Sequence, residues 1–112
     1  MTTYFMMNRC GNVFVKNQFC GVVSETDEGY LFEYDLFYLK NDFAQAVSPT
    51  LPLTKNPYFS KTLFAFFDGL IPEGWLLDLA EKNWKINYKD RMELLLLCCK
   101  DCIGAVSIEK IK

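Results

Sequence analysis

The chain has 112 residues, enough for one domain and too few for a second of ordinary size. We therefore expect residues 1–112 to form a single domain. Its 12 basic and 14 acidic side chains give a net charge of −2, and no basic cluster occurs, which argues against direct nucleic-acid binding. Aromatic residues make up 16% of the chain, with ten Phe, more than a core of this size usually needs. Large apolar side chains left on a surface commonly mark a protein partner.

The first ten residues do not combine a basic stretch with an apolar stretch, so they do not resemble a secretion signal. The longest apolar run covers residues 94–99, far fewer than the roughly 20 residues that a membrane-spanning helix needs. We therefore expect a soluble, cytoplasmic protein that does not contact a membrane. Its five cysteines are then expected to be reduced.

Three short segments near the N-terminus predict β-strands, at residues 13–16, 20–24 and 30–34. Turns are expected between them, at residues 17–18 and 25–29. In the third segment, the aromatic residues Tyr30, Phe32 and Tyr34 alternate with the other two residues, which is typical of a strand with one buried face. The three segments together indicate an antiparallel meander.

The middle of the chain is less regular. Residues 35–39 predict a single turn of helix. Residues 48–53 include Pro49 and Pro52, which exclude a helix interior and a central strand. We expect this segment to run extended along an edge of the sheet.

Three helices are expected in the second half. Ser60 is a suitable N-cap for the first and Gly69 ends it, and its apolar arc consists of Leu63, Phe64, Phe66 and Phe67. Pro72 fits the first position of the second helix, which runs to about Trp84. Asn87 caps the third, whose apolar face comprises Tyr88, Met92, Leu95 and Cys99.

A final strand is predicted over residues 105–111, where apolar residues alternate again after Gly104. Strands grouped before helices indicate the α+β class. The expected architecture is a small antiparallel sheet, made of the N-terminal meander and the C-terminal strand, packed with about three helices.

No group in the sequence points to catalysis. The chain contains no His, the usual base of a nucleophilic triad. Glycine-rich phosphate loops and the signatures of a protein kinase active site do not occur. The neighbouring carboxylates Asp27 and Glu28, and the pair Glu73 and Asp78, fit a solvated polar face. We therefore expect no catalytic residue and no cofactor.

Cys99 and Cys102 form a C-x-x-C pair, which has two functional interpretations, a redox pair and half of a zinc site. A closed zinc site needs four ligands, and Cys10 and Cys20 do not have the spacing of a second pair. Small buried side chains at a helix end are the favoured interpretation, so no metal is predicted. A small enzyme or redox protein remains the alternative.

Several sequence blocks occur in a characteristic order. They are Tyr34-Asp35 with Tyr38-Leu39, Leu51-Pro52-Leu53, the block F-F-D-G-L-I-P-E-G at residues 66–74, and the block D-C-I-G-A at residues 101–105. This order resembles the N-terminal subdomain of HipA-type serine/threonine kinases, and the likeness extends from about Val13 to Ile111. The last two blocks, at this separation, are its most specific part.

In HipA proteins this subdomain precedes a larger kinase body, which carries the ATP-binding and catalytic residues; none of these is carried over to the present chain. The chain also resembles HipS, the free-standing version in tripartite HipB–HipS–HipT toxin–antitoxin systems. The resemblance implies an antitoxin that binds and neutralises a HipT-like or HipA-like kinase. The alternative is a structural subunit, or an excised HipA N-terminal subdomain, that completes the kinase fold and bridges to a HipB-type DNA-binding protein.

Trp75 is the candidate anchor for such a kinase partner. On the helical wheel it lies about 100° from the apolar Leu76 and only about 20° from Lys82, at the border between core and solvent. With Pro72, Glu73 and Gly74 it forms the first turn of the predicted helix, and Glu73 could engage basic residues of the kinase. A rim position for Trp75 in the core, and a simple helix-dipole role for Glu73, are the structural alternatives.

Overall fold

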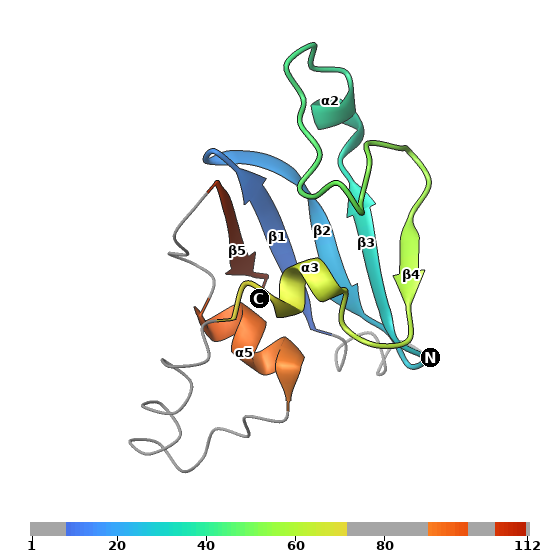
Figure 1. Ribbon diagram of the computed structural model, residues 1–112, viewed down its shortest axis with the longest axis vertical. Helices are drawn as coiled ribbons and strands as arrows, with labels where there is room; N and C mark the ends of the chain where they lie inside the picture. The colour runs from blue at the N-terminus through green and yellow to red at the C-terminus, as the bar shows by residue number, and fades with distance from the viewer. Residues whose placement is uncertain (1–8, 72–89, 99–104, 112) are drawn as a thin grey trace.

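The computed structural model describes residues 9–71, 90–98 and 105–111, and the fold is that of an α+β protein (Figure 1). Its centre is a five-stranded antiparallel sheet in the order β4-β3-β2-β1-β5. Three helices are described with it: α2 (Leu36–Leu39), α3 (Ala65–Asp68) and α5 (Arg91–Cys98). The predicted fold class and the antiparallel sheet are confirmed. No helix in the described ranges is long and apolar enough to cross a membrane.

The N-terminal meander consists of β1 (Cys10–Val15), β2 (Gln18–Glu25) and β3 (Tyr30–Tyr34), as predicted. The first turn lies at Lys16 and Asn17, one residue earlier than expected, and both have positive φ values of 51° and 67°. Two successive positive φ values are the signature of the tight turn whose twist matches that of two antiparallel strands. β1 and β2 are longer than the sequence pattern indicated, whereas β3 has the predicted bounds.

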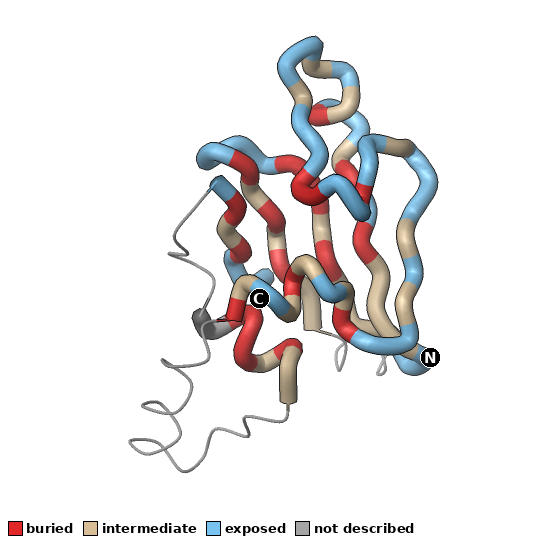
Figure 2. Tube along the Cα trace, viewed as in Figure 1, coloured by how far each residue is buried: buried red, intermediate tan, exposed pale blue. Residues whose placement is uncertain are grey.

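The last strand, β5 (Val106–Lys110), returns to pair with β1, which places β1 between β2 and β5. The strands bury alternate residues on one face, as Figure 2 shows along the sheet. Val13, Val23, Phe32 and Ile108 on this face have no exposed surface. The predicted C-terminal strand is thus confirmed, although Ile111 lies beyond its end and is exposed.

Two predictions about the middle of the chain are wrong. Ser60 does not cap a helix; it belongs to β4 (Tyr58–Ser60), which pairs with β3 through Tyr30. Residues 48–53 do not follow the sheet edge, because β4 occupies it, and the chain instead turns back between Ser48 and Leu51. The helix after β4 is therefore only the four residues of α3, with Phe64 at its N-cap and Gly69 at its C-cap.

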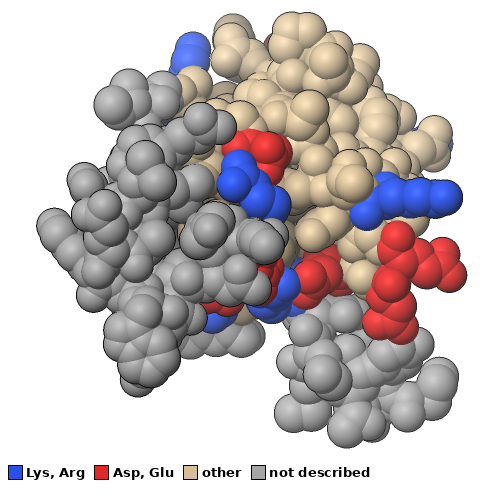
Figure 3. Space-filling model, turned by 60° about the horizontal axis from the view of Figure 1, so that its bottom comes forward, with Lys and Arg blue, Asp and Glu red and all other residues tan. Residues whose placement is uncertain are grey.

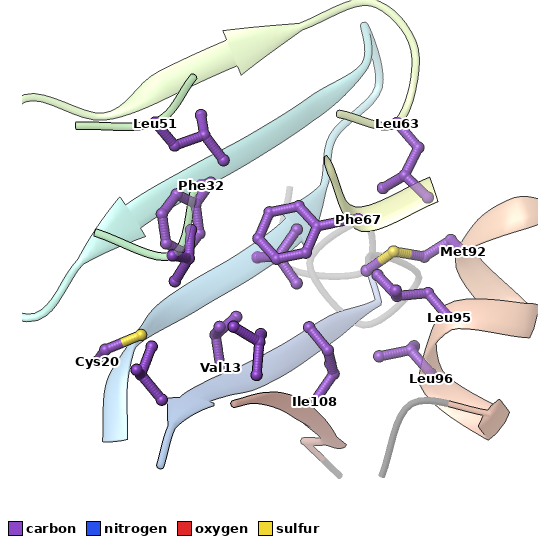
Figure 4. Packing of buried hydrophobic residues seen from close by; sticks show 14 of the residues in the cluster. Val13, Cys20, Phe32, Leu51, Leu63, Phe67, Met92, Leu95, Leu96 and Ile108 are labelled. Atoms are coloured by element: carbon purple, nitrogen blue, oxygen red, sulfur yellow. The ribbon is translucent and has the colours of Figure 1, made fainter. Parts of the chain in front are cut away.

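α3 and α5 cover the apolar face of the sheet (Figure 4). Phe67 of α3 is fully buried, with its ring centroid 5.3 Å from that of Phe32. Met92 and Leu95 of α5 are also fully buried, as predicted, and so is Leu94. Burial of a large apolar side chain contributes roughly 1.5–3 kcal/mol, so these contacts account for much of the stability. The predicted helix from Pro72 to about Trp84 lies outside the described residues.

An ionic cluster attaches the start of α5 to the sheet. The Arg9 guanidinium donates to Glu25 at 2.7 Å, to Asp90 at 2.8 Å and to Glu93 at 3.3 Å. Asp90 also accepts a hydrogen bond from the main-chain N–H of Glu93 and so caps α5 as described, whereas the predicted cap, Asn87, lies outside the described residues. Figure 3 looks onto this end of the molecule, where acidic and basic side chains lie beside one another.

Tyr34 fixes the long loop that follows α2. Its buried hydroxyl donates to the carbonyl of Leu51 and accepts from the N–H of Val47 at 3.0 Å. Burial raises the pKa of Tyr34 to about 12, so the hydroxyl stays protonated and keeps its donor role. Tyr38 makes the equivalent pair of bonds to the N–H and carbonyl of Gln45, both at 2.8 Å.

We predict that Tyr34→Phe lowers the free energy of unfolding by about 1–3 kcal/mol, because the N–H of Val47 would remain buried without its partner. Urea denaturation followed by fluorescence measures the change. Tyr30→Phe is the matched control, because the structure gives the Tyr30 hydroxyl no hydrogen bond within the described ranges; it should stay within about 0.5 kcal/mol of wild type. Equal losses in the two variants would contradict the role assigned to Tyr34.

We also predict a pH-dependent contribution from Asp90. The hydrogen bond from Arg9 lowers the pKa of Asp90, so the stability it supplies is present above the ordinary carboxyl pKa of about 4 and is lost as the pH falls through the lowered value. Asp90→Asn keeps a capping side chain and removes the charge. It should cost about 0.5–1 kcal/mol at pH 7 and nothing at strongly acid pH.

Urea denaturation at a series of pH values checks this prediction. Asp42→Asn is the control, because the side chain of Asp42 is exposed and no ion pair to it occurs within the described ranges. A deficit of Asp90→Asn that stays constant between pH 7 and pH 2 would show that the ion pair is not its cause.

Candidate functional site

The four residues predicted to contact a partner, Pro72, Glu73, Gly74 and Trp75, lie outside the described residues, and so do Cys99 and Cys102. The structure does describe how the chain reaches this segment. Ile71, the residue before it, is buried in the core with 3% of its surface exposed. Ile71 therefore holds the start of the predicted contact segment on the face of the sheet that α3 and α5 cover.

A turn and an ion pair hold that departure point. After α3, the N–H of Leu70 donates to Phe67 and the N–H of Ile71 donates to Asp68, which closes the helix end. The Asp68 carboxylate accepts from Nε of Arg91 at 2.5 Å, which links α3 to α5. The segment that begins at Pro72 consequently starts from two elements that are packed against each other.

A second candidate surface lies at the opposite end of the sheet, on α2 and the loop after it (Figure 1). Three large apolar side chains are strongly exposed there: Leu36 by 62%, Phe37 by 84% and Phe43 by 87%. The sequence predicted surplus surface aromatics but not their place. A four-residue helix can bury only one side, and here that side is taken by Tyr38.

Hydrogen bonds hold this exposed surface in a defined shape. Asp35 caps α2 by accepting from the N–H of Tyr38 at 3.1 Å. The side-chain oxygen of Asn41 accepts from the N–H of Phe43 at 2.9 Å. These bonds hold the main chain of the surface, and an aromatic side chain has only two rotatable bonds to order on binding, which favours aromatic residues here as anchors for a partner.

The described residues offer little reactive chemistry. Burial raises the pKa of Cys20 to about 12, and it also raises the pKa of Cys10, so both thiols remain protonated and poorly nucleophilic at neutral pH. Cys10 pairs with Ser24 at the far end of β2 from Cys20. Within ranges 9–71, 90–98 and 105–111, no three metal-ligating side chains gather at one point.

The HipA N-terminal domain family matches residues 11–109. The chain belongs to this family. An uncharacterized protein of Haemophilus influenzae is 33% identical over 104 residues, and the match covers 93% of this chain and 94% of that protein. The solved structure of the N-terminal domain of HipA toxin is 27% identical, with a TM-score of 0.69 and 93% of each chain covered.

Membership of this family confirms the resemblance found in the sequence blocks. It connects the chain to HipA-related toxin–antitoxin proteins and, in general terms, to a HipA-type toxin as partner. The matching region of HipA is its N-terminal domain and not the catalytic domain of the kinase. The family relationship therefore transfers no catalytic residue of the kinase to this chain.

Proposed function

We propose that this chain is an antitoxin that binds and neutralises a HipA-type serine/threonine kinase, without catalysis of its own. The observation that supports this most is the family match, which covers residues 11–109 and includes no part of the kinase catalytic domain. A domain of this kind acts on a kinase only by occupying its surface. The exposed aromatic side chains of α2 and its loop are consistent with a protein that works through contacts.

The proposed mechanism is binding in trans at the place that HipA reserves for its own N-terminal domain. The Haemophilus influenzae relative supports a free-standing form, because the match covers 94% of its length and leaves it little chain for a kinase body. A separate domain can be present or absent independently of the kinase. Its binding can therefore regulate the activity of the kinase, rather than only complete the kinase fold.

The proposed kinase contact consists of Pro72, Glu73, Gly74 and Trp75. A Trp at the tip of a helix can fill a pocket of the partner, and such fully desolvated aromatic anchors commonly dominate binding energy. The burial of Ile71 and the ion pair between Asp68 and Arg91 would hold the start of this segment in place. A ternary complex with a HipB-type DNA-binding protein in the cytoplasm, without direct contact to nucleic acid or membrane, completes the proposal.

A structural subunit is the second candidate function. In that case the chain would complete the kinase fold and bridge it to a HipB-type protein, and its loss would lower the solubility or activity of the kinase. The second exposed surface on α2 supports this alternative, since a bridging protein needs two separate contact surfaces.

Co-expression separates the two functions. Bacteria that carry an inducible HipA-type kinase lacking its N-terminal domain should stop growing when the kinase is produced alone, and should grow normally when this chain is produced with it. A structural subunit would instead increase soluble, active kinase and deepen the growth arrest. Continued arrest at equal levels of both proteins, with no complex on gel filtration, would exclude the antitoxin function.

We predict that Trp75→Ala weakens binding to the kinase by about 2 kcal/mol or more, because the partner pocket would lose its aromatic anchor. Isothermal titration calorimetry measures the affinity. Phe59→Ala is a matched control, because it removes an aromatic side chain that is 52% exposed on the edge strand β4, outside both candidate surfaces. An unchanged affinity for Trp75→Ala, in a variant with wild-type stability, would remove Trp75 from the contact.

A further inference from the structure

A shallow hollow of about 270 Å³ lies where β2 begins and β3 ends, beside α2. Val22 and Glu33 are paired across the two strands, on the sheet face opposite to the buried Val23 and Phe32. The hollow is thus separate from the helical side of the sheet and from the departure point at Ile71. It is lined by Phe19, Val22, Glu33, Asp35 and Leu36, together with Gly21 and Tyr34.

The lining of the hollow combines two carboxylates with apolar walls. Glu33 is exposed, and neither it nor Asp35 forms an ion pair with a described basic side chain. Asp35 uses one oxygen, Oδ2, to cap α2, which leaves Oδ1 without a partner among the described residues. Phe19 and Leu36 expose 36% and 62% of their surfaces beside these carboxylates.

The volume limits what can bind. Pockets for small organic ligands usually measure about 300–1,000 Å³ and enclose most of the ligand, whereas this hollow is smaller and open. It suits one long side chain. Lys and Arg combine an aliphatic stem, which can lie on Phe19 and Leu36, with a cationic head, which can reach Glu33 and Asp35.

We propose that this hollow is a docking site for a Lys or Arg side chain presented by a partner protein beside an apolar residue. Charge complementarity identifies the occupant, because the two carboxylates make the hollow unfavourable for an acidic or purely apolar segment. The apolar neighbour of the incoming cation covers Leu36 and the strongly exposed Phe37 next to it. This second contact is independent of the kinase contact proposed at Pro72 to Trp75.

The test uses the full-length chain labelled with ¹⁵N and a blocked peptide, acetyl-Leu-Arg-Phe-amide, followed by NMR. We expect saturable shifts centred on the amides of Phe19, Val22, Glu33 and Leu36. The same peptide with citrulline in place of Arg, which keeps the shape and removes the charge, should bind at least about fivefold more weakly. Equal binding of the two peptides, or shifts centred elsewhere, would overturn the proposal.

Variants of the chain complete the experiment. Asp35→Asn retains the helix cap, and Glu33→Gln alters an exposed side chain, so both should fold; together they should weaken the Arg peptide by roughly five- to tenfold. Glu28→Gln removes an exposed carboxylate away from the hollow and should leave binding unchanged. A normal affinity in the double variant would refute the site. Shifts at these amides that appear on concentrating the chain alone would show a second copy as occupant and would refute it too.

Discussion

The pairing of β5 with β1 is the constraint on which the rest of the molecule depends. It joins the end of the chain to its beginning, from Gly11 opposite Lys110 to Val15 opposite Val106. Because β1 also pairs with β2, it becomes an interior strand of a five-stranded sheet rather than an edge. Only a sheet of this width offers a face on which both α3 and α5 can bury their apolar side chains.

The two ends of the sheet serve different purposes. At one end, Arg9 and Arg91 connect the sheet, α3 and α5 through ion pairs, and the chain leaves the core at Ile71 toward the proposed kinase contact. At the other end, Tyr34 and Tyr38 fix a loop whose apolar side chains point to solvent. A rigid core between two separate surfaces suits a protein that acts by contact.

Sequence patterns predicted the elements whose signal is local. Alternation in residues 30–34 and the β-rich segments before them indicated the meander, and the alternation after Gly104 indicated β5. The patterns failed where tertiary pairing decides. The segment with Ser60 reads as a helix start, yet β3 has a free edge and takes Tyr58 to Ser60 as its partner strand.

The two candidate surfaces also differ in how far the sequence predicted them. The family-specific block around Pro72 to Trp75 was visible in the sequence, while the exposure of Phe37 and Phe43 was not, because a Phe in a core and a Phe on a surface look alike in composition. Likewise, Glu33 and Asp35 are two apart in an extended stretch and so share one face, but the hollow that they flank also needs Phe19 at the start of β2, a neighbour that only the strand pairing supplies.

The shortness of β4 has a consequence for behaviour at high concentration. A sheet edge with a long row of free main-chain groups invites a strand of another molecule and so promotes fibrils. β4 presents only three residues and is preceded by Pro57, whose ring nitrogen carries no hydrogen to donate. This flank of the sheet therefore gives an intruding strand too few partners to start polymerisation, which keeps a chain rich in Phe available for specific recognition.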